Sequence, residues 1–369
     1  MLNNNQMKSF RFWVSTMLLA SLFLSCACRQ EDEIPIPHVL KINTYGMLEE
    51  AMDIQVTGPE GLEVEIDFGD GTKTSATVNN VVTHSYSTPG DYILTASGDG
   101  LSVTNKVRIY NLVAISALME DITAPGYDYI LNMSHRGNCS DKSIPENSIA
   151  ALKNCIAKGV EFIEIDTHIT SDGIVVVCHD ETVDRTTDGT GAIPDMTYAD
   201  IQKLHLRDRN GNVTTERMPT LEEILKAGRG KIYFDLDYSP RTATTSQVME
   251  VVQKLNMMEQ CLFYCNSPEK VTEVISLDPS AHPYVWYTNY ASVQGLGRRC
   301  FSQASDPADV SRAEAAGLVT TVMTSLPENY EEDLEEARNI VADFRNVRVI
   351  MSNASDTVLD YLRSIDRHN

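Results

Sequence analysis

Acidic and histidine residues stand where short apolar runs of this sequence end. His135 follows an apolar run at 129–134, and Glu164 and Asp166 lie within another at 161–168. Because side chains alternate along a strand with a period of two, Glu164 and Asp166 should project from the same face. Ca²⁺ and Mg²⁺ prefer carboxylate oxygens as ligands. Imidazole titrates near neutral pH, so a neighbouring histidine could transfer protons.

A hairpin should bring a second histidine to the same place. The turn at 171–173 is too short to contain a crossover helix, so 174–178 must return antiparallel and present His179. A further strand-like run at 232–236 carries Asp235. The three carboxylates could therefore hold one Ca²⁺ or Mg²⁺.

These residue types suit the cleavage of a phosphodiester. The reaction needs charge neutralisation at phosphorus, an activated nucleophile and a proton for the alkoxide leaving group. A bound metal would polarise a phosphoryl oxygen. His135 and His179 suit a general base and a general acid, and Arg136 offers a planar guanidinium to the phosphate.

The elements that would position these residues form an α/β fold, a (β/α)₈ TIM barrel over 128–369. Strands ending at His135 and Asp166 begin a series of eight, and helix-like segments follow most of them. The other six strands are expected near 232–236, 261–265, 284–287, 300–303, 319–323 and 347–351. Residues from about 180 to 229 would form an insertion over the mouth. Active sites of such barrels lie at the carboxyl ends of the strands.

Seven short motifs occur in a fixed order over roughly 129–237: H-R-G, P-E-N, E-x-D, D-G-x-x-V-V-x-H-D, D-R-T-T, G-x-G and P-T-L-E-E. Their order and spacing resemble those of the glycerophosphodiester phosphodiesterase family. The resemblance implies hydrolysis of a glycerophosphodiester, either a small molecule or a lipid headgroup, to glycerol phosphate and an alcohol. It implies that His135 and His179 are the acid/base pair and that the three acids bind the metal. Glu146 and Asn147 would line the same pocket as Arg136.

One departure from that family concerns Asp237. The family ends this region with E-x-K, whereas Asp235 and Asp237 form D-x-D here. Asp237 should face inward with Asp235 and take part in substrate binding. A carboxylate beside a phosphate is unfavourable, so we expect it to have a second metal, a cationic substrate group, or a rim arginine such as Arg207 or Arg209 as partner.

Asp237 also leaves other functions open. The barrel could be a phosphodiesterase or phospholipase D-like enzyme acting on a different substrate. It could also be a catalytically altered barrel that serves as a binding protein in the cell envelope.

Residues 38–111 show alternating strand patterns without a helical period. The motifs D-F-G-D-G at 67–71, H-x-Y at 84–86 and P-G-x-Y at 89–92 resemble a PKD-type repeat, an immunoglobulin-like all-β sandwich. We interpret the acidic residues of the first motif as turn formers. Such a module would contact a polymer or a protein, or space the barrel from an anchor. Residues 112–127 would be a linker or close the barrel floor.

The first 25 residues resemble a signal peptide, with a short apolar core that ends at Cys26. The sequence F-L-S-C is similar to a bacterial lipoprotein cleavage site, which would lipidate Cys26; plain secretion is the alternative. Residues 26–37 read as an extended tether. These features predict a cell-envelope protein that is lipid-anchored to the outer membrane.

Composition excludes some classes. Of 369 residues, 42% are hydrophobic and 22% charged, which is ordinary for a globular chain and unlike a disordered or polytopic membrane protein. The 30 basic and 52 acidic residues give a net charge of −22, which disfavours nucleic-acid binding. Six cysteines follow the signal junction; they could form disulfides or remain buried thiols, and none has zinc-site spacing.

Overall fold

A computed structural model of the chain describes residues 39–42, 45–98, 100–239, 241–286, 293 and 300–368. The predicted signal peptide, the tether and Cys26 lie outside the described residues. The chain divides into Met1–Pro37 and His38–Asn369, and only the second unit is described below. Within the described ranges, no helix combines the length and the apolar character needed to cross a bilayer.

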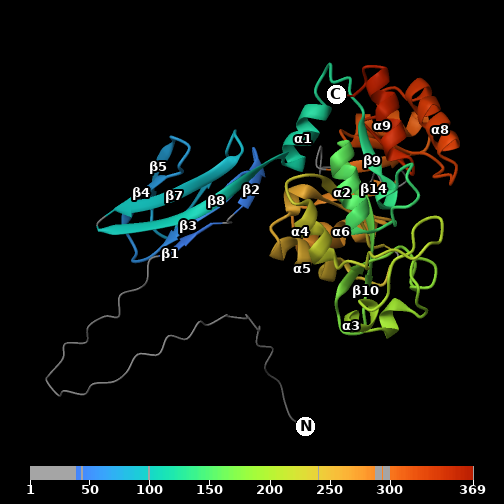
Figure 1. The fold of residues 1–369 in the computed structure, drawn as a ribbon. Helices are drawn as coiled ribbons and strands as arrows, with labels where there is room; N and C mark the ends of the chain where they lie inside the picture. Colours follow the sequence, from blue (N-terminus) through green and yellow to red (C-terminus); the bar gives the residue numbers. More distant parts are fainter. Residues whose placement is uncertain are drawn as a thin grey trace, which may run out of the picture. The chain divides into compact units, whose positions relative to one another are not determined.

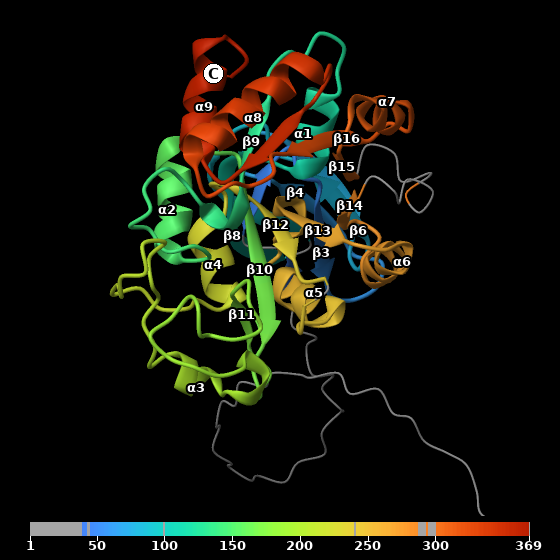
Figure 2. The same cartoon turned by 90° about the vertical axis from the view of Figure 1, so that its right-hand side faces the viewer.

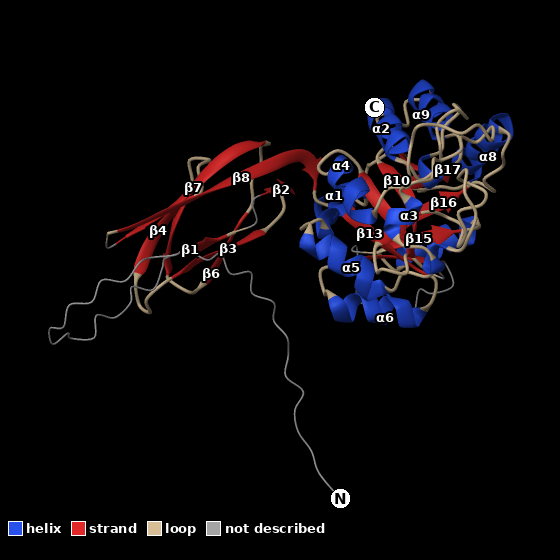
Figure 3. Ribbon diagram, turned by 60° about the horizontal axis from the view of Figure 1, so that its bottom comes forward, coloured by secondary structure: helices blue, strands red, loops and turns tan. Residues whose placement is uncertain are grey.

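The first part of this unit is all β (Figures 1 and 3). An antiparallel sheet has the order β1 (Val39–Lys41), β3 (Met52–Thr57), β6 (Val81–His84). A second sheet has the order β2 (Tyr45–Leu48), β8 (Leu101–Val113), β7 (Gly90–Gly98), β4 (Glu63–Asp67), β5 (Lys73–Thr77). Buried and exposed side chains alternate along β3 of the first sheet and β4 of the second. The buried side chains of both sheets belong to one apolar core. The all-β expectation is thus confirmed.

The motifs of this β domain meet around its first hairpin. His84 stacks on Phe68 with ring centroids 3.8 Å apart, and its Nε2 lies 2.7 Å from Asp70 Oδ2. The Tyr86 hydroxyl donates to the Phe68 carbonyl at 3.0 Å. Asp67 and Asp70 accept from backbone amides two residues ahead, both at 2.9 Å, so the predicted turn role is confirmed. Membership of the PKD type stays a prediction.

Eight parallel strands form the barrel (Figure 3). In sheet order they are β9 (Leu131–Ser134), β10 (Phe162–Ile169), β12 (Tyr233–Asp237), β13 (Cys261–Cys265), β14 (His282–Trp286), β15 (Phe301–Ala304), β16 (Val319–Met323) and β17 (Val349–Ser352). The barrel closes because β9 pairs with both β17 and β10. The eight-stranded TIM barrel is confirmed. β11 (Val175–Val177) returns antiparallel beside β10, as the short turn predicted (Figure 2).

Helices surround these strands, as the strand–helix alternation predicts. They are α2 (Ile149–Lys158), α4 (Leu221–Gly228), α5 (Thr245–Lys254), α6 (Pro268–Leu277), α7 (Pro307–Ala315), α8 (Tyr330–Asp343) and α9 (Ser355–Ser364). The motif P-T-L-E-E is the start of α4, where Thr220 and Glu223 form a capping box. Because α4 packs in the main barrel core, the inserted segment ends before α4 and not at 229. The insertion includes the short helices η2 (Ile193–Asp195) and α3 (Tyr198–Ile201) and has a small core of its own against β11.

The barrel interior is divided by height. Near the amino ends of the strands, side chains such as Phe162, Tyr233 and Phe301 form an apolar layer. Helix α1 (Ile115–Ile122), within the predicted linker, packs three buried side chains against that layer. Polar side chains begin above it, toward the carboxyl ends. Among the described residues, five cysteines are buried free thiols and Cys300 is buried too; the five are Cys139, Cys155, Cys178, Cys261 and Cys265.

We predict that Tyr86→Phe destabilises the β domain by about 1 to 3 kcal/mol, because the Phe68 carbonyl loses a buried hydrogen-bond donor. Hydrogen exchange of the β7 amides would measure the free energy of opening. Tyr92→Phe is the matched control, since it removes an exposed hydrogen bond to the Thr88 carbonyl. Equal effects of the two substitutions would contradict the prediction.

Candidate active site

Four carboxylates face the barrel interior from two neighbouring strands. The pairing of β10 with β12 aligns Glu164 with Asp235 and Asp166 with Asp237. Phe162, two residues before Glu164, belongs to the inner apolar layer, so the period of two turns these acids inward. The acids therefore form two levels, with Asp166 and Asp237 nearer the mouth.

Three of these acids meet. One oxygen from each of Glu164, Asp166 and Asp237 lies within 4.8 Å of the others, an arrangement that could hold a metal ion. Two of the predicted ligands, Glu164 and Asp166, belong to this cluster. Its third member is Asp237, which the sequence analysis assigned to substrate binding. The role of Asp235 as a metal ligand stays a prediction.

The cluster is electrostatically costly. Burial and the neighbouring Asp166 raise the pKa of Glu164 well above its usual range. Burial and Asp237 do the same for the pKa of Asp235, and burial together with Asp166 raises the pKa of Asp237 to about 6. Burial opposes ionisation of Asp166 too, but the charges of Arg241 and Arg136 outweigh it and lower its pKa. Burial thus favours the protonated forms of Glu164, Asp235 and Asp237, whereas a cation bound among them would favour the ionised forms.

Asp235 supplies an independent sign that the site fits a cation. Its side chain is 1% exposed, and its Oδ1 has no hydrogen-bond partner within the described residues. Asp235 lines a cavity of about 150 Å³ together with His135, Glu164 and Asp237. Aromatic and thioether side chains of Tyr264, Tyr284, Trp286, Met323 and Met351, with Gln303, complete the lining. A buried oxygen without a donor, beside a carboxylate cluster, suits a hard metal ion.

His135 lies at the start of η1 (His135–Gly137), directly after β9. Its Nδ1 is 2.8 Å from Asn353 Oδ1, an oxygen that also accepts from the Asn138 amide at 3.0 Å. Because that oxygen can only accept, Nδ1 carries the proton and Nε2 is the basic nitrogen. Burial and the charge of Arg136 lower the pKa of His135 to about 4, despite the Asn353 hydrogen bond. At neutral pH His135 is therefore neutral and can accept a proton.

His179 follows β11 and is about one-third exposed (32%). Its Nδ1 lies 2.7 Å from Asp180 Oδ1. Arg185, from the D-R-T-T motif, donates to Asp180 and to Glu146 and lowers the pKa of Asp180. The charged Asp180 thus fixes the Nδ1–H tautomer, which leaves Nε2 available.

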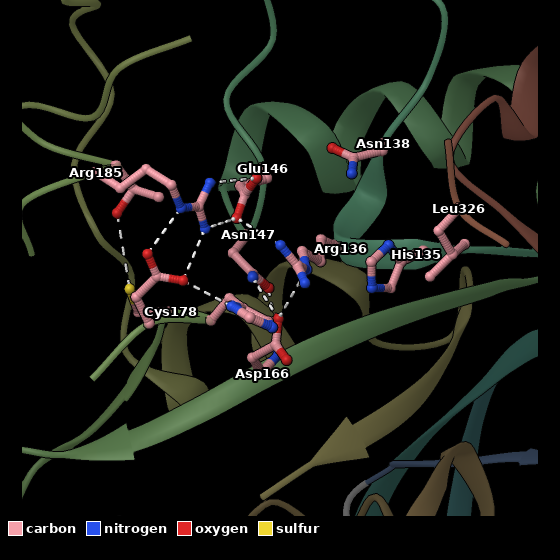
Figure 4. A network of polar contacts seen from close by, with 12 residues as sticks. His135, Arg136, Asn138, Glu146, Asn147, Asp166, Cys178, Arg185 and Leu326 are labelled. Atoms are coloured by element: carbon pink, nitrogen blue, oxygen red, sulfur yellow. Dashed lines mark hydrogen bonds and ion pairs between the residues drawn. The ribbon is translucent and has the colours of Figure 1, made fainter. Parts of the chain in front are cut away.

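The H-R-G and P-E-N motifs orient the acids through an unusual backbone pair (Figure 4). Arg136 and Asn147 have φ values of 55° and 53°, and the Asn147 amide donates to the Arg136 carbonyl. The Arg136 amide then donates to Glu164 Oε2 at 2.8 Å, and Asn147 Nδ2 donates to Asp166 Oδ2 at 2.8 Å. Glu146 pairs with Arg136 at 3.3 Å and also with Arg185. Asn147 thus contacts the cluster directly, whereas Glu146 acts on it through Arg136.

Two functional residues escaped the sequence analysis. Asn353 follows β17, and its contact with His135 joins residues 218 positions apart in the sequence. Arg241, four residues after Asp237, pairs with both Asp237 and Asp166. The predicted rim arginines do not reach Asp237: Arg207 binds the carbonyls of Thr187 and Gly211, and Arg209 those of Cys139 and Asp141.

His168, on β10, supports the position of His179. It is 3% exposed, and its two ring nitrogens contact the Thr242 hydroxyl and the His179 carbonyl at 2.9 and 3.1 Å. It therefore holds the backbone of His179.

Comparison with known proteins matches residues 135–281 to the glycerophosphoryl diester phosphodiesterase family. A glycerophosphodiester phosphodiesterase of Caldanaerobacter subterraneus subsp. tengcongensis is 45% identical over 97 residues, which are 26% of this chain and 39% of the relative. Human glycerophosphodiester phosphodiesterase 1 is 38% identical over 146 residues, which are 37% of this chain and 43% of the relative. The chain thus spans less than half the length of these two relatives.

Solved structures resemble the barrel. A glycerophosphoryl diester phosphodiesterase of Parabacteroides distasonis has a TM-score of 0.62 at 22% identity and covers 69% of this chain and 94% of its own. A phosphodiesterase of Oleispira antarctica, solved with the product sn-glycerol-3-phosphate, has a TM-score of 0.53 at 20% identity and covers 64% and 97%. At these identities the likeness shows the fold alone.

We predict that Asn353→Asp raises the pKa of His135 above about 4, because a carboxylate at Nδ1 favours the imidazolium. Titration of the histidine Cε1–H resonances by NMR would measure this. Asn329→Asp, an exposed cap of α8, adds the same charge away from the site and should leave that pKa unchanged. A pKa that stays near 4 in Asn353→Asp would refute the assigned contact.

Proposed function

We propose that this chain is a metal-dependent phosphodiester hydrolase of the glycerophosphoryl diester phosphodiesterase family, which cleaves a glycerophosphodiester to glycerol phosphate and an alcohol. One observation carries the proposal: Glu164 and Asp237 of a metal-competent carboxylate cluster line one cavity with the neutral imidazole of His135 at the carboxyl end of the barrel. The family match over 135–281, which includes all four carboxylates and both histidines, supports it.

Glu164, Asp166 and Asp237 are the residues that would hold Ca²⁺ or Mg²⁺. The bound ion would supply Lewis acidity at a phosphoryl oxygen and charge neutralisation. Asn147 and the Arg136 backbone amide keep the ligands in place through their hydrogen bonds to Asp166 and Glu164. Ca²⁺ and Mg²⁺ share this ligand chemistry, so both belong to the proposal.

His135 is the general base of the proposed reaction. Its Nε2 is the basic nitrogen and its low pKa keeps it unprotonated, so it can take a proton from an attacking hydroxyl or water. His179 is the general acid, because Asp180 Oδ1 accepts from its Nδ1 and so orients the ring. The proton leaves from Nε2 of His179 to the departing alkoxide oxygen.

Residues in and around the cavity would suit the binding of a small phosphodiester. Arg136 is 17% exposed and stands beside Asp166, where its guanidinium could contact a phosphate oxygen. The Oleispira antarctica phosphodiesterase of similar fold was solved with sn-glycerol-3-phosphate, which suits the proposed product. The aromatic and thioether wall would contact the alcohol or glycerol part.

We expect His135→Ala and His179→Ala each to lower kcat by about 10² to 10⁴, since each removes a proton-transfer group. The assay would follow glycerol phosphate released from glycerophosphodiesters that differ in their alcohol. His205→Ala is the matched control, because His205 lies in the insertion and contacts Asp188. A near wild-type rate in either active-site variant would remove that histidine from the mechanism. No hydrolysis of any substrate by the wild type would favour the binding-protein alternative.

A chelator should abolish activity, and added Ca²⁺ or Mg²⁺ should restore it. Glu164→Gln and Asp166→Asn should weaken metal binding by about tenfold or more, since each removes a ligand. Asp235→Asn, an equally buried change outside the three-acid cluster, should have a smaller effect. Calorimetric metal titration would measure the affinities. The greatest loss in Asp235→Asn would restore the trio first predicted and contradict the one assigned here.

A further inference from the structure

Arg241 places a fixed positive charge within the carboxylate cluster. It lies in the turn after β12, and its side chain is 15% exposed. One guanidinium nitrogen donates to Asp166 Oδ1 and, at 3.0 Å, to Asp237 Oδ2. The other terminal nitrogen donates to the His179 carbonyl at 2.6 Å. A single side chain therefore joins both upper-level acids to the segment that carries the proposed general acid.

The turn that carries Arg241 is itself anchored. The Arg241 amide donates to the Tyr238 carbonyl, and the Thr242 hydroxyl accepts from the Ile169 amide at 3.0 Å. The same hydroxyl contacts His168. These bonds keep the backbone of Arg241 beside the end of β10, so the guanidinium cannot move far from the acids.

Asp237 explains why a cation is needed here. A lysine at this position would bring its own positive charge, whereas Asp237 adds a negative one beside Asp166. Arg136 cannot serve both acids, since it pairs with Glu146 and lies 3.6 Å from Asp166. Arg241, which lies in the turn after β12, supplies the positive charge that offsets the added negative charge of Asp237.

The guanidinium and a divalent ion would need the same acids. Asp166 and Asp237 are two of the three groups that could hold the metal, and Arg241 binds one oxygen of each. A divalent ion among these groups would repel the guanidinium a few ångströms away, in a site where burial weakens screening. The two cations therefore oppose each other's binding.

We propose that Arg241 is a positioning residue that acts as an internal counter-ion, competing with the divalent metal for Asp166 and Asp237 and lowering the metal affinity of the site. The inference rests on the metal site of the proposed function. It assigns to Arg241 a role that Arg207 and Arg209 do not have, since both bind backbone carbonyls in the insertion and the loop beside it.

The test is a calorimetric titration of the metal-stripped full chain with Ca²⁺ and with Mg²⁺. Arg241→Gln should bind at least one of these ions about tenfold or more tightly than the wild type. Arg241→Lys keeps the charge and should stay closer to the wild type. Arg207→Gln, the matched control, removes an arginine that does not contact the acids and should not change the affinity. Equal or weaker binding by Arg241→Gln, or the same shift in Arg207→Gln, would overturn the proposal.

A crystal structure of the metal-loaded wild type gives a second test that needs no variant. With an ion bound by Glu164, Asp166 and Asp237, Arg241 should have lost its contact with at least one of Asp166 and Asp237. Retention of both contacts beside the bound ion would overturn the proposal. The proposal would also be overturned if neither Ca²⁺ nor Mg²⁺ bound to the wild type or to Arg241→Gln.

Hydrolysis measured in parallel separates this inference from the proposed function. Tighter metal binding by Arg241→Gln in a chain that hydrolyses no glycerophosphodiester would support the inference and reject the proposed function. Hydrolysis together with equal metal affinities would reject the inference alone.

Discussion

The mouth of the barrel is organised by the cost of burying like charges together. Two neighbouring strands direct four carboxyl groups inward, and three of those groups share one small volume. Burial and mutual repulsion raise the pKa of Glu164, Asp235 and Asp237. Only Asp166, which two arginines face, has a lowered pKa. The arginines, the hydrogen-bond donors and the proposed metal all reduce the repulsion among these buried carboxylates.

The barrel supplies the rigidity that makes such a cluster sustainable. Closed parallel pairing fixes the height of each inward side chain, while the loops after the strands bring the donors. Arg136 and Asn147 adopt the left-handed backbone region, which non-glycine residues seldom occupy, and they bond to each other. Such strained pairs persist where the surroundings hold them and are common at functional sites. Here they direct one donor at Glu164 and another at Asp166.

Acidic residues of the β domain show how strongly context decides their chemistry. Asp67 and Asp70 accept backbone hydrogen bonds in an exposed hairpin, and those of Asp67 lower its pKa. They serve the turn, and Asp67 also pairs with Lys73 at 3.2 Å. Asp235, by contrast, is buried without a donor for one oxygen. The same residue type is thus a local structural element in one domain and part of a charged site in the other.

Sequence alone determined whatever depends on local periodicity and spacing. The eight strands, the antiparallel return of β11 and the inward direction of Glu164 and Asp166 all follow from runs a few residues long, because hydrophobic alternation records which face is buried. The tertiary structure decided what depends on distance across the barrel. The register of β12 against β10 places Asp235 level with Glu164 and Asp237 level with Asp166. Arg241 reaches the acids through a turn held by another strand, and Asn353 reaches His135 only because closure of the barrel joins its last strand to its first. No local pattern encodes such contacts, since each requires the rest of the chain to have folded.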